Sequence, residues 1–409
     1  MPIVRFLLDN ARWIVAGFLL TFFSAFGQTY FISLSAGAIR DEFGLSHGGF
    51  GMLYMVATLA SALTLPWLGR IVDWYPTRKV MFIVVPALSA ACVAMMLNRS
   101  LFALVLIVYA LRLFGQGMMT QTAFTATARW FVGNRGRAIS LVTLGHNVGE
   151  ALFPLLFVFT VGLAGWRGAW GLAALLLLVV ALPAGGALIK GERRPRADDP
   201  GEPRRAVRDW TRQEVLRDPL FHLILAGVLA PGFIGTTIFF HQIYLVELRG
   251  WSLETFAASF ALMSLLTITF ALIGGYLIDR FSAVSLLPGF LVPLSLACLV
   301  LGLFEGQWSA FAFMALLGIS YGISSTLFGA LWPELYGLEH LGSIRSIVVA
   351  FMVFATAMGP GITGYLIDVG VSYPAQIVAM GFYCIAASVV LFWASRRLLT
   401  RLELEAKPA

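Results

Sequence analysis

The feature that most constrains this chain is a series of long segments that contain no acidic or basic residue. Ten of them are 19 residues or longer, and two more, 100–128 and 138–166, are each interrupted by one charge, Arg112 or Glu150. The ten are 13–39, 43–69, 80–98, 168–189, 219–246, 255–278, 281–304, 306–333, 346–367 and 369–395. About 20 apolar residues in a helix cross the ~30 Å hydrocarbon core of a bilayer. The sequence therefore predicts an all-α membrane protein with twelve transmembrane helices.

Composition and charge distribution support a protein that lies in lipid. Hydrophobic residues make up 59% of the chain and charged residues only 12%, whereas soluble proteins contain about 25% charged residues. The net charge of +7 comes from Lys and Arg in short runs between apolar segments, a pattern that orients membrane proteins rather than one that binds nucleic acid. Outside 190–218, one set of loops holds most of these residues, and the alternate set holds only Arg40, Arg99, Arg167 and Arg249. We therefore expect a multi-pass protein of the inner (cytoplasmic) membrane, with both termini in the cytoplasm.

The two halves of the chain repeat one another at a constant offset of 206 positions. Gly69-Arg-Ile-Val-Asp73 recurs as Gly275-Tyr-Leu-Ile-Asp279, and at the same offset Cys92 matches Cys298 and Pro154 matches Pro360. We expect residues 1–189 and 219–409 to form two six-helix bundles, joined by a cytoplasmic linker at 190–218. Transporters built from parallel repeats bind their substrates near the middle of the membrane, between the repeats.

The segment Gly69-x-x-x-Asp73-Trp-Tyr-Pro-Thr-Arg78-Lys79 resembles the loop signature of the major facilitator superfamily, although Trp74 and Pro76 depart from it. This resemblance implies two pseudo-symmetric six-helix bundles and secondary transport by alternating access. It also implies a conformational switch that consists of Gly69, Asp73, Arg78, Gly275, Asp279 and Arg280. The alternative is that these residues only cap helix ends and hold the loops in the cytoplasm.

Arg112 and Glu150 are the only ionisable acid and base deep within the predicted spans. A charge there costs at least about 2.5–3.5 kcal/mol, which makes a functional role the default hypothesis. His146 precedes Glu150 by four residues and shares its helix face. Because burial disfavours a charged carboxyl group, such a pair is suited to carrying a proton. We expect Glu150 and His146 to couple transport to protons and Arg112 to bind substrate. Alternatively, Arg112 and Glu150 form a structural ion pair.

Further candidates for substrate binding are polar residues in spans 1, 4, 7 and 10, which the resemblance assigns to the substrate cavity, and Asn147 next to His146 in span 5. They are Gln28, Tyr30, Gln116, Gln121, Asn147, His241, Gln242 and Tyr321, with Tyr54 in the second span. Each could instead hydrogen-bond a neighbouring helix. One His and one Glu are too few ligands for a metal site, so we expect no metal.

The run Arg129-Trp-Phe-Val-Gly-Asn-Arg135-Gly-Arg137-Ala lies between spans 4 and 5 and resembles the corresponding loop of monocarboxylate and oxalate/formate-type porters. Those families also carry an arginine in span 8, and the predicted span 8 of this chain, 255–278, contains none. We expect proton-coupled uptake of a small organic solute, and the alternative is an efflux antiporter for drugs or metabolites. No nucleotide-binding or nucleophile motif occurs in the sequence. We therefore expect a monomer that is not an enzyme, that uses no cofactor, and whose partners are a small-molecule substrate, protons and the lipid bilayer.

Overall fold

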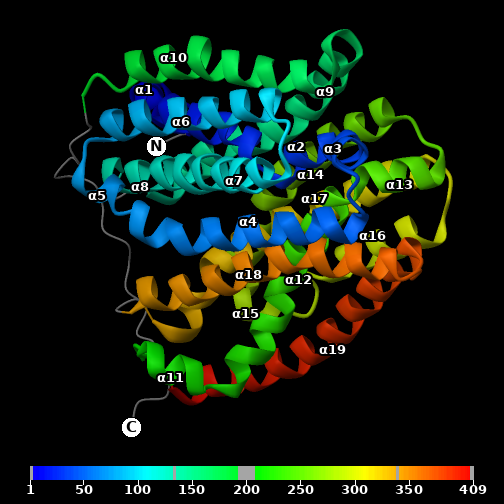
Figure 1. Cartoon of the computed structure of the whole chain (residues 1–409). Coiled ribbons are helices and arrows are strands. Elements are labelled where there is room, and N and C mark those ends of the chain that lie inside the picture. The colour runs from blue at the N-terminus through cyan, green and yellow to red at the C-terminus, as the bar shows by residue number, and fades with distance from the viewer. Residues whose placement is uncertain (1–2, 132–134, 192–207, 338–339, 406–409) are drawn as a thin grey trace. The chain divides into compact units, whose positions relative to one another are not determined.

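The computed structural model describes the backbone of residues 3–131, 135–191, 208–337 and 340–405. Side chains are described for the same residues except 3–9, 73, 135, 136, 279, 342, 343, 346 and 403–405. Within these ranges the regular structure is helical, without any strand (Figure 1). This confirms the predicted all-α class.

The chain divides into two compact units. Unit 1 comprises residues 1–45 and 52–203, and unit 2 comprises residues 46–51 and 204–409. The boundary at 203 and 204 lies inside the predicted linker 190–218, of which residues 192–207 lie outside the described residues. The grouping of 46–51 with unit 2 does not follow from the sequence repeat. It arises because Asp368 accepts hydrogen bonds from Ser46 Oγ (2.7 Å) and Gly48 N (2.9 Å).

Unit 1 contains the elements that correspond to the first six predicted spans. They are α1 (Ile3–Phe23), η1 (Ser24–Gly27), α2 (Thr29–Ile32), η2 (Ser33–Ser35), α3 (Ala36–Phe43), α4 (His47–Leu68, whose first turn belongs to unit 2), α5 (Ile71–Trp74), α6 (Thr77–Leu97), α7 (Leu101–Leu111), η3 (Arg112–Met119), α8 (Thr120–Trp130), α9 (Arg135–Leu176), η4 (Leu177–Ala181) and α10 (Leu182–Leu188).

Unit 2 contains the remaining helices. They are α11 (Arg212–Arg217), α12 (Pro219–Phe240), α13 (Gln242–Arg249), α14 (Leu253–Phe281), α15 (Ala283–Leu286), α16 (Val292–Leu303), α17 (Trp308–Tyr336), α18 (Leu341–Asp368) and α19 (Tyr373–Glu405). The short helix α11 has a capping box in which Thr211 N and Oγ1 donate to the Glu214 carboxylate. These bonds, the one from the Thr211 backbone foremost, hold the pKa of Glu214 below its ordinary value.

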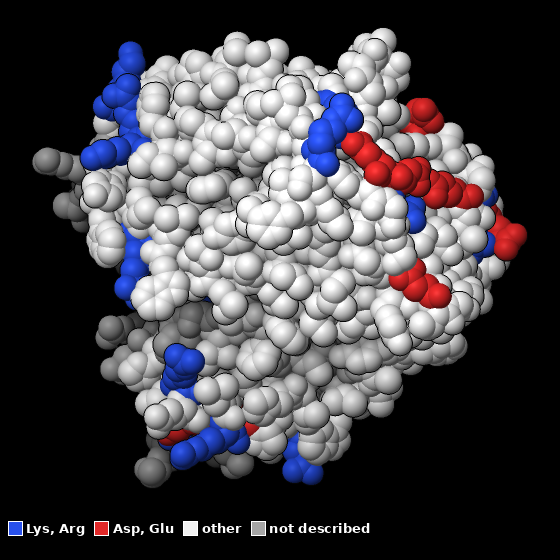
Figure 2. Space-filling view, viewed as in Figure 1, with Lys and Arg blue, Asp and Glu red and all other residues white. Residues whose placement is uncertain are grey.

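Ten helices among the described residues are long and apolar enough to cross a membrane. One of them runs from Arg137 to Leu188, 52 residues, and contains a non-helical Gly165 (φ 68°, ψ 174°) that separates two spans. The shorter apolar helix Val292–Leu303 supplies one more. These additions match the twelve predicted spans. The surface along the helices is largely uncharged, and the Lys and Arg side chains in view gather at helix ends (Figure 2).

Candidate functional site

The first predicted span of unit 1 is a broken helix. α1 ends at Phe23, the 3₁₀ turn η1 follows, and Gln28 has an extended backbone (φ −84°, ψ 153°) before α2 begins at Thr29. Gln28 and Thr29 are both buried, each 8% exposed. A break in a membrane helix frees backbone carbonyl groups from their helical partners, and transporters bind substrates and ions at such breaks. This break therefore identifies the centre of a candidate site in unit 1.

Arg112 reaches this break from η3. It is only 2% exposed, and its guanidinium donates to Gly27 O (3.1 Å) and to Thr29 Oγ1 (3.3 Å). The guanidinium carbon also lies 5.4 Å from the centre of the Tyr54 ring, and the Tyr54 hydroxyl hydrogen-bonds Thr29 Oγ1 at 2.7 Å. Arg112 Nε has no hydrogen-bond partner among the described residues. One carbonyl, one hydroxyl and one aromatic face thus hold the guanidinium, and its Nε–H donor is not used by any of them.

Backbone geometry explains how η3 brings Arg112 so close. η3 is a π-helix of eight residues that begins at Arg112, and π-helical turns in α-helices often occur at functional sites. Gly115 in η3 packs directly on Gly27, so that a Cβ on Gly115 would lie 2.7 Å from the Gly27 nitrogen. Only two glycines allow this backbone approach. The Gly27 carbonyl is therefore within reach of the Arg112 side chain.

Glu150, His146 and Tyr30 form a second cluster beside the break. Glu150 is 6% exposed and Tyr30, in α2, is 3% exposed. The ring centres of Tyr30 and His146 are 6.4 Å apart in an edge-to-face arrangement. The structure thus brings together three residues that the sequence predicted as a proton and substrate site. We refer to Tyr30, His146 and Glu150 as the carboxyl cluster.

Close packing of α9 on α1 fixes the position of the carboxyl cluster. A Cβ on Gly145 would overlap the Phe18 carbonyl oxygen, and a Cβ on Gly149 would lie 2.8 Å from that of Phe22. Thr21 Oγ1 also donates to Val142 O at 2.6 Å. Small residues four apart let membrane helices approach in this way. Since Gly145 and Gly149 immediately precede His146 and Glu150, the same contact sets where those side chains lie.

Aromatic rings surround the carboxyl cluster on one side. Phe153, one turn after Glu150, has its ring centre 4.6 Å from those of Phe22 and Phe26. Phe26 in turn lies edge-on to Phe31 at 5.0 Å. Phe153 thus belongs to a packed group of aromatic rings one turn from Glu150, and apolar surroundings of this kind strengthen electrostatic interactions.

Arg112 and Glu150 form no ion pair in the described part of the chain. The structural pairing that the sequence left open is therefore absent, because Arg112 is held by Gly27, Thr29 and Tyr54 instead. Arg112 donates to Thr29, and His146, one helical turn before Glu150, lies against the ring of the next residue of α2, Tyr30.

The other predicted substrate residues are distributed over both units. In unit 1, Gln28 Nε2 donates weakly to Ser24 Oγ (3.5 Å), Asn147 is 9% exposed, and Gln116 and Gln121 lie on η3 and α8. Gln121 is exposed.

In unit 2, His241 occupies the junction of α12 and α13, where its Nε2 lies 3.2 Å from Pro360 O. Gln242 is fully buried, and the Tyr321 hydroxyl donates to Pro231 O at 3.4 Å. No group of three or more His, Cys, Asp and Glu is placed to hold a metal ion among the described residues.

The predicted switch residues lie near helix ends. Gly69 follows α4 and donates to Leu65 O at 2.7 Å, and Arg78, in the first turn of α6, lies over the Phe82 ring at 5.5 Å. Gly275 and Arg280 are in α14, where Arg280 donates to the Tyr276 hydroxyl at 3.3 Å. The side chains of Asp73 and Asp279 lie outside the described residues.

Two residues that contact the predicted site or switch residues, Thr29 and Arg129, were not predicted from the sequence. Thr29 bonds both Arg112 and Tyr54, and Arg129 donates to the carbonyl of Val72, directly before Asp73. The cluster of Gly27, Gln28 and Thr29 within an apolar span was the available signal for a broken helix. No sequence pattern indicates which carbonyl Arg129 reaches.

A sequence model described as Major Facilitator Superfamily matches residues 17–346 and 260–407. The MFS-type transporter YcxA of Bacillus subtilis (strain 168) is 23% identical over 383 residues, which cover 88% of this chain and 91% of the relative. An MFS-type transporter of Gibberella moniliformis (strain M3125 / FGSC 7600) is 24% identical over 298 residues, which cover 69% of this chain and 66% of the relative.

Two crystal structures of a bacterial homolog to the human lysosomal transporter Spinster share the fold. The inward-facing, unoccupied form matches with a TM-score of 0.74 and 18% identity, over 96% of this chain and 98% of the other. The inward-facing, occupied form matches with a TM-score of 0.69 and 17% identity, over 100% and 99%.

Proposed function

The chain belongs to the major facilitator superfamily and is a multi-pass membrane transporter, and we propose that it drives the uptake of a small organic solute with protons carried by Glu150. The observation that carries this proposal is the burial of Glu150 (6% exposed) in a membrane span without an ion-pair partner in the described part of the chain. An ionised carboxylate there costs at least about 2.5–3.5 kcal/mol. Proton binding removes that cost, and in this proposal Glu150 gains and loses a proton during the transport cycle.

His146 and Tyr30 serve this proton site as neighbours that adjust it. His146 lies one helical turn from Glu150, and the edge-to-face contact with Tyr30 holds the imidazole next to α2. Imidazole is the side chain whose ordinary titration falls near neutral pH, which suits it to exchange protons with a carboxyl group.

Arg112 is the substrate anchor in this proposal. Its guanidinium is fixed by Gly27 and Thr29, and its Nε has no partner in the described part of the chain. Guanidinium groups bind carboxylates through two parallel hydrogen bonds. The arrangement favours a solute that carries a carboxylate.

The link between substrate and proton is α2. A solute that draws Arg112 away from Thr29 changes the position of α2, and Tyr30 on the same four-residue helix then moves relative to Glu150. Substrate binding thereby alters the surroundings of the proton carrier. A shift of this kind needs only a difference in affinity between two conformations.

A test uses purified protein in proteoliposomes with an imposed proton gradient and a mixed pool of organic acids and aromatic nutrients outside. Trapped solutes are identified by mass spectrometry. Glu150→Gln should abolish accumulation against a concentration gradient and preserve exchange of the same solute at equal concentrations. Asp41→Asn, an exposed acid of the same unit, is the matched control and should behave as the native protein. Full accumulation by Glu150→Gln would refute the proposal, and accumulation only under an outward-directed assay would indicate efflux.

We also propose that both termini and the 190–218 segment lie in the cytoplasm. The proposal rests on the loop charges, because Lys and Arg are enriched in cytoplasmic loops. Reporter fusions after Asp198 and after Glu305 should give opposite signals in a bacterial inner membrane. Identical signals from the two fusions would contradict this topology.

A further inference from the structure

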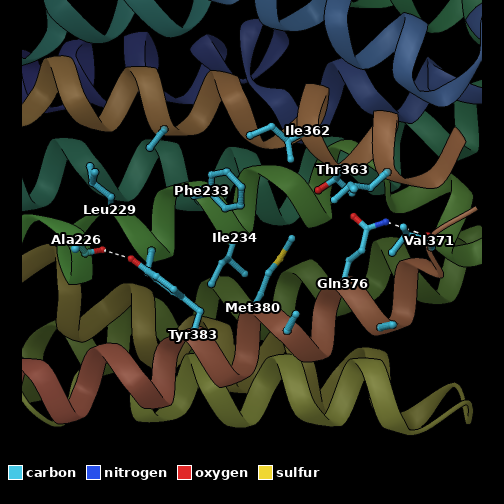
Figure 3. A pocket seen from close by; sticks show the side chains of 15 residues that line it. Ala226, Leu229, Phe233, Ile234, Ile362, Thr363, Val371, Gln376, Met380 and Tyr383 are labelled. Atoms are coloured by element: carbon cyan, nitrogen blue, oxygen red, sulfur yellow. Dashed lines mark hydrogen bonds between the residues drawn. The ribbon is translucent and has the colours of Figure 1, made fainter. Parts of the chain in front are cut away.

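Unit 2 contains a cavity that the proposed transport site does not use. It has a volume of about 750 Å³ and lies between α12, α18 and α19. Figure 3 shows side chains of these three helices converging on it. Pockets of about 300–1,000 Å³ with mostly apolar walls and a few polar groups are the usual size and character of small-ligand sites. The cavity therefore has the dimensions of a binding site.

The walls of the cavity are apolar along most of its length. Leu229, Phe233 and Ile234 of α12 face Ile362 of α18 and Met380 of α19 across it (Figure 3). None of the described residues that line the cavity is charged. The lining runs from Ala226 to Ile234 on α12 and from Ala355 to Leu366 on α18. Since a helix rises about 1.5 Å per residue, the cavity is elongated along the helices, as an alkyl chain would require.

One end of the cavity carries a buried acceptor without a partner. Gln376 is 6% exposed, its Nε2 donates to Val371 O at 3.1 Å, and its Oε1 has no hydrogen-bond partner among the described residues. The bond to a carbonyl identifies the nitrogen as the donor end of the amide, and the oxygen points toward Thr363, which also lines the cavity (Figure 3). A buried acceptor left unpaired costs about 1–3 kcal/mol and calls for a donor from elsewhere.

The opposite end offers no comparable group. The Tyr383 hydroxyl donates to Ala226 O at 2.9 Å, so its proton is already used (Figure 3). Tyr383 is 47% exposed and lies beside Phe382 and Ile385, which are 59% and 44% exposed. Large apolar side chains exposed on a membrane-spanning helix face lipid. The cavity thus opens next to a lipid-facing surface of α19.

We propose that this cavity binds a neutral, single-chain lipid with a hydroxylated head, of the monoacylglycerol type, taken from the bilayer. The alkyl chain occupies the apolar length between α12, α18 and α19, and a head hydroxyl donates to Gln376 Oε1. The absence of charged residues from the described lining selects an uncharged head over a phosphate or a carboxylate. One chain fits because the site is a single elongated cavity. The site is independent of the proton and substrate residues of unit 1.

The test measures binding of monoolein and of methyl oleate to the purified full-length protein in nanodiscs. Methyl oleate has the same chain and no donor. The native protein should bind monoolein about three- to tenfold more tightly, the value of one net neutral hydrogen bond. Gln376→Met should remove that preference and leave methyl oleate binding within about twofold. Equal binding of the two probes to the native protein, or tighter binding of a two-chain phospholipid, would overturn the proposal.

A second pair of variants separates occupancy of the cavity from adsorption to the helix surface. Ala379 lines the cavity, and Ala386 is an exposed residue two turns later on α19 that does not line it. Ala379→Phe should reduce monoolein binding at least tenfold, because the ring fills the space of the chain. Ala386→Phe should bind as the native protein does. Equal binding by the two variants, each folded by its thermal unfolding midpoint, would show that the lipid lies elsewhere and would refute the site.

Discussion

Replacement of Arg112 by Met should destabilise the protein less than removal of one partner from a buried ion pair does. The change leaves the Gly27 carbonyl without its donor, which costs about 1–3 kcal/mol, and removes the contact with the Tyr54 ring, which is worth about 0.5–2 kcal/mol. Thr29 keeps its hydrogen bond to Tyr54. Against these losses, an apolar side chain avoids about 2.5–3.5 kcal/mol for a charge within the membrane. The terms nearly cancel, so the net loss should not exceed about 2.5 kcal/mol.

Arg401 provides the matched comparison. Its Nη1 lies 2.8 Å from the carboxylate of Asp218, whose side chain is 5% exposed. Removal of Arg401 leaves that carboxylate without its cation, although Tyr336 Oη (3.1 Å) and Leu220 N (3.0 Å) still donate to it. Breaking a buried pair costs about 3–5 kcal/mol, and we expect the lower end, about 3 kcal/mol, because the Arg401 side chain is 19% exposed. Arg401→Met should therefore be the less stable variant, although Arg112 is the more deeply buried arginine.

The first measurement is the thermal unfolding midpoint of each variant in the same detergent, with tryptophan fluorescence as the probe. The second is solute accumulation in proteoliposomes. Arg112→Met should remain folded and lose accumulation, because it lacks the substrate anchor. The double variant with Glu150→Gln should be no more stable than Arg112→Met. If Arg112→Met unfolds as readily as Arg401→Met, and Glu150→Gln restores its stability, then Arg112 and Glu150 are an ion pair and the reasoning fails.

Three further predictions follow from the helix ends and contacts. Asp73→Asn should slow transport more than it weakens solute binding, and Asp279→Asn should do less because its copy of the loop signature is incomplete; unchanged transport in the Asp73 variant would leave that residue a helix cap. Gly145→Ala should destabilise by about 1–3 kcal/mol through overlap with α1, whereas Gly162→Ala on the same helix has open space and should be neutral or stabilise by up to about 1 kcal/mol; equal unfolding midpoints would contradict the close approach. Asp368→Asn should cost about 0.3–1 kcal/mol by weakening the charge at the first turn of α4, and the loss should shrink at high salt.

The twelve spans could be predicted from the sequence because transfer into lipid depends on each segment's own side chains. A run such as 219–246 has no charge and is long enough to cross the membrane, whatever its neighbours are. Span boundaries were less accurate in places. The predicted span 281–304 is two helices, α15 and α16, with turns between them, because turn geometry depends on local packing that hydropathy does not record.

The sequence predicted which ionisable residues form the candidate site, but only some of the contacts between them. Charged residues are so rare within the spans that Arg112 and Glu150 could be identified directly, and the four-residue spacing from Glu150 added His146. The alternative that Arg112 and Glu150 form an ion pair came from their similar depth in the membrane, which can be estimated from their positions along their helices. Similar depth does not determine which way each side chain faces around its helix axis or which residues it contacts. In the described structure, Arg112 donates to Gly27 and Thr29 instead.

By itself, the sequence determined that this chain spans a membrane, that its halves are copies, and that two ionisable residues lie deep within it. These properties are local, since each follows from the chemistry of one segment or from the match of one segment to another. The tertiary structure decided that span 1 breaks at Gln28, that Gly27 and Gly115 meet, and that Arg112 and His146 contact neighbouring residues of α2, Thr29 and Tyr30. Those contacts depend on the distance and rotation between helices, and packing in three dimensions sets both.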